Sequence, residues 1–492
     1  MIAAHLPALQ IVVPLLSAPL CMLLARRRLA YALSLVVCWT AFAISIMLLG
    51  QVLEGGVISY RLGGWAPPWG IEYRVDLVNA YVLLIVAAIG ALVITYASPS
   101  VAREIGAGRE TLFYTAYLLC LAGLLGVTIT GDAFNIFVFL EISSLSSYIL
   151  ISIGKDRRAL TASFQYLIFG TIGATFFLIG VGLIYQATGS LNIVDMSNRV
   201  GPLGESRTVQ AAFAFMAVGL AIKAALFPLH FWLPNAYAYA PSVVTAFLAA
   251  TATKVSIYVL IRTYFNLFGP DFSFEVMTLG PVLMVLSIAA MLIGSTIAIF
   301  QDDVKRSLAY SSVAQIGYMV LGISFATVLG VTGGMLHLFN HALIKAALFL
   351  AIGCLFWRTG SVSIEAMRGL GKRMPWTMAA IVAGGLSLIG VPLTVGFISK
   401  WYLLLAAIDS GLWWISIFIL ISSLLAIIYV WRLVEAAYLS PSPDGAERGE
   451  APLVMLIPTW TLVLANFYFG VDTRVSVGVA EQAAKFLLGT GS

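Results

Sequence analysis

The sequence predicts an all-α polytopic membrane protein with about fourteen transmembrane helices. Of its 492 residues, 61% are hydrophobic and only 10% are charged, and the mean hydropathy is +0.99. Apolar runs of about eighteen residues or more recur along the whole chain, and each is long enough to cross a bilayer as a helix. No polar stretch is long enough to build a soluble domain with its own core.

The remaining composition argues against several other classes of protein. The four cysteines are scattered through apolar runs without CxxC spacing, so neither a metal cluster nor a disulfide framework is expected. The net charge of +5 comes from lysines and arginines in loops and requires no nucleic-acid partner.

The predicted spans follow one another with short connections, as expected for antiparallel neighbours in a helical bundle. Helix ends read from sequence are uncertain by a few residues. The approximate limits are 6–25, 30–53, 77–97, 111–129, 133–153, 159–187, 208–227, 242–268, 276–300, 304–326, 328–356, 374–408, 411–433 and 452–470.

Two segments, Thr208–Ala240 and Met374–Ala407, are too long for a single span. A continuous helix of that length would measure about 50 Å, against a hydrocarbon core of about 30 Å. Both segments are therefore expected to be broken helices, the seventh and the twelfth in order. Such a pair in corresponding places indicates an inverted-repeat transporter. The expected interruptions are Pro228, Pro234, Gly390, Pro392 and Gly396.

Three connections are long enough to interpret. Gly55–Asp76 alternates polar and apolar residues around a Gly/Pro-rich centre, which predicts a small β-hairpin. Leu191–Arg207 is expected to form an irregular cap. Ser440–Pro452 has the composition of a flexible linker.

The charges of the loops predict their sides, because cytoplasmic loops carry an excess of lysine and arginine. With the N-terminus placed outside, the inner loops hold basic clusters such as Arg26–Arg28, Lys155–Arg158 and Arg368–Arg373, whereas the outer segments hold few basic residues. We therefore expect an outside N-terminus.

The apolar run Val331–Leu350 carries three titratable side chains at intervals of four residues, His337, His341 and Lys345. In a helix these positions lie on one face and form a polar stripe roughly 12 Å long. Ionisable groups at bilayer depth cost about 2.5–3.5 kcal/mol each and normally face a protein interior or a water-filled path. The stripe indicates a proton path. The alternative is two hydrogen-bonded core histidines and a lysine that reaches a helix end.

Only one carboxylate, Glu141, lies well inside a predicted span, and Lys223 is its natural partner. Serines follow Glu141 and could hold water or bond neighbouring helices. One carboxylate cannot pair with all of the buried lysines, and burial disfavours the protonated form of a lysine. This imbalance favours proton transfer over a purely structural salt bridge, which is the alternative. The lysines concerned are Lys223, Lys254, Lys345 and Lys400.

Two other polar residues are interpreted as structural. Asp132 precedes an apolar run in TGDAFN and suits the N-cap of a helix. His230 follows the first predicted break and is expected in a re-entrant loop.

Several motifs together resemble the proton-translocating antiporter-like family, which comprises the large membrane subunits of respiratory complex I, their relatives in membrane-bound hydrogenases, and the A and D subunits of Mrp-type cation/proton antiporters. The resemblance covers roughly residues 75 to 435. The motifs are FNIFVFLEISSLSSYILI, IKAALFPLHFWLPNAYAYAPSVVTAFLAATATK, DDVKRSLAYSSVAQIGYMVLG, HLFNHALIKAALFLAIG and GVPLTVGFISKW.

The resemblance implies fourteen helices with two inverted five-helix repeats. The expected divisions are residues 1–97, three helices with the outer hairpin; 111–268, the first repeat; 276–439, the second repeat; and 452–492, helix fourteen and a tail. It also implies a central polar axis in which Glu141 and Lys223 are a coupled pair and Lys254 is a bridge. His337, His341 and Lys345 are then the relay, and Lys400, where some relatives have glutamate, is the terminal carrier.

Length, the motif TGDAFNIFVFLEI and the terminal lysine make the chain most similar to the D subunits of Mrp antiporters. The resemblance therefore implies a secondary transporter subunit in a bacterial inner membrane that exchanges H⁺ for Na⁺ or another monovalent cation, with other Mrp-type membrane subunits as partners. It implies no cofactor and no resident metal. The alternative within the family is a proton-pumping subunit of a complex I-like or hydrogenase-like redox enzyme.

A catalytic redox protein that itself binds NADH, flavin, haem or quinone is a third hypothesis of a different class. The sequence carries no GxGxxG motif, no pair of haem ligands and no cysteine cluster that would support it.

Overall fold

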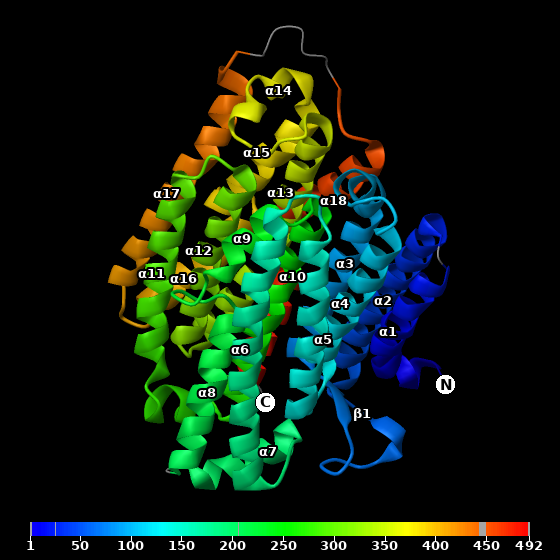
Figure 1. The fold of residues 1–492 in the computed structure, drawn as a ribbon. Coiled ribbons are helices and arrows are strands. Elements are labelled where there is room, and N and C mark those ends of the chain that lie inside the picture. The colour runs from blue at the N-terminus through cyan, green and yellow to red at the C-terminus, as the bar shows by residue number, and fades with distance from the viewer. Residues whose placement is uncertain (1, 25, 205, 442–448, 491–492) are drawn as a thin grey trace.

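The computed structural model describes residues 2–24, 26–204, 206–441 and 449–490. The chain forms an upright bundle of helices (Figure 1). One end carries the antiparallel pair β1 (Ile58–Arg61) and β2 (Glu72–Val75), and is called the hairpin end. The opposite end carries the short helix α14 (Leu370–Arg373) and is called the α14 end.

The long helices run between these two ends, and shorter helices connect or interrupt them. In the first half they are α1 (Leu6–Leu24), α2 (Arg27–Gly55), α3 (Leu77–Glu104), α4 (Glu110–Ile129), α5 (Ala133–Ser152), α6 (Arg158–Thr188), α7 (Ile193–Val200), α8 (Arg207–Lys223), α9 (Trp232–Tyr239) and α10 (Ser242–Ile261). In the second half they are α11 (Leu279–Ile299), α12 (Val304–Ser324), α13 (Val328–Thr359), α14, α15 (Pro375–Ile389), α16 (Val395–Asp409), α17 (Trp414–Val434), α18 (Leu453–Val471) and α19 (Arg474–Leu487).

The all-α polytopic fold is confirmed. Among the described residues, 11 helices are long and apolar enough to cross a membrane by length and composition. Each predicted span contains one helix or one pair of half-helices, although fourteen as the number of membrane crossings stays a prediction. The division of the chain into two inverted repeats also stays a prediction.

Both predicted breaks are present. The first lies between α8 and α9 and contains Pro228. The expectation that Pro234 also interrupts the helix is wrong, because Pro234 lies in the first turn of α9, where a missing N–H removes no helical hydrogen bond.

The second break separates α15 from α16. Gly390 caps α15 with a φ of 92°, in the left-handed region that favours glycine. Gly396 lies in the first turn of α16, and a Cβ atom there would lie 1.8 Å from the carbonyl oxygen of Ser387. The absent side chain therefore allows the two half-helices to approach each other.

The connections are partly as expected. The hairpin is confirmed, with Ile58 opposite Val75 in an antiparallel register. The expected irregular cap between Leu191 and Arg207 is wrong, because Asn192 caps the helix α7 by accepting hydrogen bonds from two N–H groups of its first turn. The C-terminal tail forms α19, which packs on α13 and α3. Of the predicted linker, residues 442–448 lie outside the described residues.

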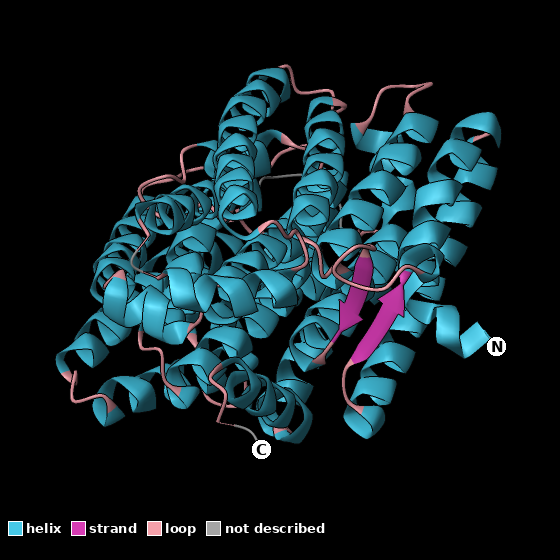
Figure 2. Ribbon diagram, turned by 90° about the horizontal axis from the view of Figure 1, so that it is seen from below, coloured by secondary structure: helices cyan, strands magenta, loops and turns pink. Residues whose placement is uncertain are grey.

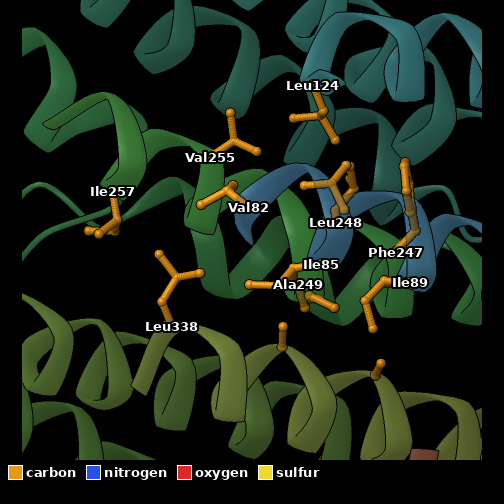
Figure 3. Close-up of a cluster of buried hydrophobic side chains, with 14 of the residues drawn as sticks. Val82, Ile85, Ile89, Leu124, Phe247, Leu248, Ala249, Val255, Ile257 and Leu338 are labelled. Atoms are coloured by element: carbon orange, nitrogen blue, oxygen red, sulfur yellow. The ribbon is translucent and has the colours of Figure 1, made fainter. Parts of the chain in front are cut away.

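The most buried of the long apolar helices form the centre of the bundle. In α10 and α13, 94% of the most apolar window is buried, in α4 the share is 83% and in α3 it is 78%. Their side chains interlock around Val82, Phe247, Leu248 and Leu338 (Figure 3). Peripheral helices such as α2, α6, α11 and α17 bury less than half and expose apolar side chains outward. Figure 2 shows this packing with many helices seen end-on. The central helices therefore hold their polar groups away from lipid.

Candidate functional site

The first element of the site is an ion pair between α5 and α8. Lys223 is the last residue of α8, at the break, and its Nζ lies 3.4 Å from Glu141 Oε1 and 2.8 Å from Ser144 Oγ. A charge-assisted hydrogen bond is usually about 2.7–2.9 Å long. The lysine is therefore bonded more closely to a neutral serine than to its counter-ion. The Glu141 side chain is 24% exposed, whereas that of Lys223 is 3% exposed.

The second element of the site is Lys254, which lies in the middle of α10 and is fully buried. Its ammonium donates to the carbonyl of Ala249 and lies 3.4 Å from Thr253 Oγ1. Its charge acts on the three polar side chains of α13, which packs against α10. Lys254 thus places a buried charge on the helix that packs against the stripe of α13.

His337 is held by two neighbouring helices. Its Nε2 lies 2.9 Å from Gln315 Oε1 on α12, and its Nδ1 lies 2.9 Å from Ser399 Oγ on α16. An amide oxygen only accepts, so this pair requires a proton on Nε2. In the neutral ring, Nδ1 then accepts from the serine hydroxyl.

His341 lies between His337 and Lys345 on the same face of α13, and it is fully buried. Its ring is parallel to that of His337, with centroids 6.2 Å apart. In the described part of the chain, neither of its ring nitrogens has a hydrogen-bond partner. Buried polar atoms are almost always bonded. Among the described residues, His341 is one of the exceptions to this rule.

Lys345 completes the stripe. Its Nζ donates to Leu308 O at 2.7 Å and to Ser311 Oγ at 2.5 Å, both on α12. The residue is fully buried. The alternative of a lysine that reaches a helix end is therefore wrong, since its ammonium remains inside the bundle.

Lys400 lies in the second turn of α16, which follows the second break. Its Nζ donates to Leu388 O at 3.1 Å, Ile389 O at 2.7 Å and Ser423 Oγ at 2.9 Å. The two carbonyls are the free C-terminal end of α15, where the helix dipole favours a cation. Its ammonium also lies 5.0 Å from the ring centroid of Tyr318. The charge of Lys400 acts on His337, which joins it to the stripe.

The predicted residues therefore form two groups. Lys254, the stripe of α13 and Lys400 lie on three helices, of which α10 and α16 each pack against α13, whereas Glu141 and Lys223 form a bonded pair of their own. Sequence reasoning did not identify the neutral partners on α12, α16 and α17, because such residues are common in apolar helices. The partners missed are Gln315, Ser311, Ser399 and Ser423.

The two residues interpreted as structural lie at the start of α5 and in the first break. Asp132 is confirmed as an N-cap, since its carboxylate accepts the N–H of Asn135 at 2.8 Å. His230 is buried in the first break and stacks between Phe227 and Phe231.

The fold and the site together define a polytopic helical membrane protein with a buried line of titratable groups between two broken helices. Comparison with known proteins identifies its family: the chain belongs to the NADH:quinone oxidoreductase/Mrp antiporter transmembrane family, which matches residues 130–426. The predicted membership of the antiporter-like family is thereby confirmed.

Its relatives include subunits of a NADH-quinone oxidoreductase and of a Na⁺/H⁺ antiporter. The chain is 43% identical to the N subunit of the NADH-quinone oxidoreductase of Desulforudis audaxviator, over 98% of each chain. It is 32% identical to the D subunit of the Na⁺/H⁺ antiporter of Alkalihalophilus pseudofirmus, over 89% of each. A chain in the structure of the Mrp complex from Dietzia sp. superposes with a TM-score of 0.89 at 28% identity, covering 99% of this chain and 98% of that one.

Proposed function

We propose that this chain is the proton-translocating, D-type subunit of a multisubunit Mrp cation/proton antiporter, and that it moves H⁺ along the buried line in exchange for Na⁺ or another monovalent cation. The observation that carries the proposal is the imbalance of charge along the line: of its four buried lysines only Lys223 pairs with a carboxylate, and the line also holds two buried histidines. Most of these groups are held by neutral oxygen atoms, which stabilise an ammonium but do not lock a proton in place.

In this proposal Glu141 and Lys223 act as a switch. A unit charge pair at about 4 Å and an effective dielectric constant near 20 attracts by about 4 kcal/mol. Opening the pair would change the proton affinity of Lys223 by up to about a thousandfold. Its loose 3.4 Å contact is consistent with a pair that opens and closes. Lys254 then receives the proton, His337, His341 and Lys345 relay it, and Lys400 is the terminal carrier.

The proposed location is a bacterial inner membrane, with the N-terminus and the hairpin end outside. The proposed partners are other Mrp-type membrane subunits. The similarity to a chain of the Mrp complex from Dietzia sp. supports an assembly of several chains. The apolar side chains exposed on peripheral helices are compatible with lipid and with neighbouring subunits.

The second candidate is a proton-pumping subunit of a complex I-like redox enzyme. The 43% identity to the N subunit of a NADH-quinone oxidoreductase favours it. In that case the proton chemistry of this chain is the same but the driving reaction differs. This chain itself carries out no redox chemistry in either proposal.

Two experiments separate these candidates. The first identifies the chains that co-purify with this protein from native membranes: small Mrp subunits support the antiporter, and iron–sulfur or nickel subunits support the redox complex. The second measures Na⁺-dependent proton flux in vesicles that contain the whole complex. Flux that requires an added electron donor would contradict the antiporter proposal.

A further inference from the structure

A polar pocket lies at the hairpin end of the central helices, apart from the proposed line. It has a volume of about 230 Å³ and lies between α3, α7 and α10, with Phe486 of α19 at its edge. Its walls carry Asp76, Thr130 and Ser197. The proposed function assigns no role to this pocket.

The floor of the pocket is a bonded chain of buried side chains on α10 and its extension. Arg262 pairs with Asp76 at 2.5 Å, and its Nε donates to the phenol oxygen of Tyr258 at 3.0 Å. The Tyr258 hydroxyl in turn donates to Thr128 O at 2.8 Å. Tyr258 and Arg262 are 2% and 8% exposed, so the pocket ends in polar groups deep in the bundle.

Tyr258 separates the polar pocket from an apolar part of the bundle, because it lines both. On its other side is an apolar gap, too narrow for water, that is lined by Tyr81, Val82 and Leu338. Water from the hairpin end can therefore reach the phenol through the pocket but cannot pass it along this gap.

The phenol of Tyr258 lies one helical turn from Lys254, which belongs to the proposed line. Lys254 and Tyr258 lie on α10, and Arg262 begins the π-helix Arg262–Leu267 that extends it. The three residues are spaced by four, so their side chains leave the same face. The Lys254 ammonium is turned toward the α14 end, where it bonds Ala249. A lysine side chain has four rotatable bonds, so the ammonium can turn toward the next turn, where Tyr258 lies.

We propose that the pocket is a proton port of Lys254 and that Tyr258 is the group through which the proton crosses. When the ammonium turns toward the hairpin end, Lys254 gives one proton to the phenol oxygen and becomes a neutral amine. The phenol releases its own proton to water in the pocket and stays neutral. This inference rests on the proposed function and adds to it an access route at the hairpin end.

The Arg262 guanidinium gives this port its selectivity. A metal cation that enters the pocket meets a buried positive charge beside the phenol, whereas a proton passes by exchange on the hydroxyl. Asp76 balances the guanidinium through one carboxylate oxygen, Oδ1, which also accepts from two N–H groups of α3. Repulsion by the guanidinium would favour passage of H⁺ over Na⁺ beside the phenol.

The first test replaces the hydroxyl alone. In vesicles that contain the whole complex, Tyr258→Phe should lower proton flux by about 100-fold while the complex still assembles. The matched control is Tyr81→Phe, which removes a buried hydroxyl without a hydrogen-bond partner from the wall of the apolar gap and should leave the flux unchanged. Normal flux in Tyr258→Phe, together with lost flux in Lys254→Ala, overturns the port but not the proposed function.

A second test keeps Tyr258 in place. Ser197→Cys puts a thiol on the pocket wall, and a membrane-impermeant thiol reagent added at the hairpin side should then block flux. The same reagent should leave the unsubstituted complex active, since the four cysteines of this chain are buried. Complete modification without loss of flux overturns the port, also in the case that Tyr258→Phe does not assemble. Normal flux in Lys254→Ala overturns the proposed function and the port together.

Discussion

The two broken helices place a lysine at the same kind of position but stabilise it differently. Lys223 ends α8 beside a carboxylate and a serine. Lys400 follows the break between α15 and α16 and is held by two carbonyls and a serine, with no carboxylate among these partners. The first lysine therefore has a counter-ion that can move away, whereas the second depends on backbone dipoles that are fixed. This difference suggests a switch in the first half and a terminal carrier in the second.

The largest effect is expected when the counter-ion of the first half is removed. Glu141→Gln keeps the shape of the side chain and removes its charge, so coupled exchange should be abolished while the complex still assembles. Glu141→Asp keeps the charge with a shorter reach and should retain partial activity with a shifted pH profile. Exchange in membrane vesicles across pH measures both variants. If Gln at this position exchanges as well as Glu, the switch does not exist.

The next largest effect concerns the groups that connect the two halves. Lys254→Ala and Lys345→Ala should each strongly reduce exchange, because each removes a proton carrier from the line between the breaks. Assembly should be retained, since their partners are neutral oxygen atoms that lose no counter-ion. Vesicle flux and the amount of complex in the membrane are measured together. Loss of the protein from the membrane would show that these lysines are structural instead.

A smaller effect should distinguish the two breaks by stability. Lys223→Ala leaves Glu141 without its counter-ion and should cost about 1–3 kcal/mol, whereas Lys400→Ala leaves only neutral acceptors and should cost less. The thermal unfolding of the solubilised complex measures this difference. The double variant Glu141→Gln/Lys223→Ala should recover stability relative to Lys223→Ala. Equal losses in both single variants would contradict the comparison.

The smallest effect concerns the serines beside the two lysines. Ser144→Ala removes the shorter of the two contacts of Lys223, and Ser423→Ala removes one of three acceptors from Lys400. Each should cost about 1 kcal/mol of stability or less. Exchange should fall more in Ser144→Ala, because the remaining contact of Lys223 is the loose ion pair. A larger loss in Ser423→Ala would reverse the assignment of switch and carrier.

The sequence by itself determined the membrane class, the positions of the helices and the existence of both breaks. Hydropathy is summed along the chain, so each apolar run can be recognised without knowledge of its neighbours. Glycine and proline change the conformations open to their own backbone, so both breaks can be predicted from the sequence alone. Pro234 and the cap between Leu191 and Arg207 were the exceptions, because a proline is compatible with a first helical turn and α7 depends on a short local cap.

Only the tertiary structure decided which groups meet. Gln315 and Ser399 bind the same histidine, His337, from two helices, although they are 84 positions apart in the sequence. Nothing local in either segment indicates that contact. The pairing of Glu141 with Lys223 was expected, but its looseness and the closer serine were not. The free ring nitrogens of His341 and the pocket above Tyr258 depend likewise on helices from both halves of the chain. Side-chain contacts across a bundle depend on how the helices pack, and an apolar sequence permits many packings until the whole chain has selected one.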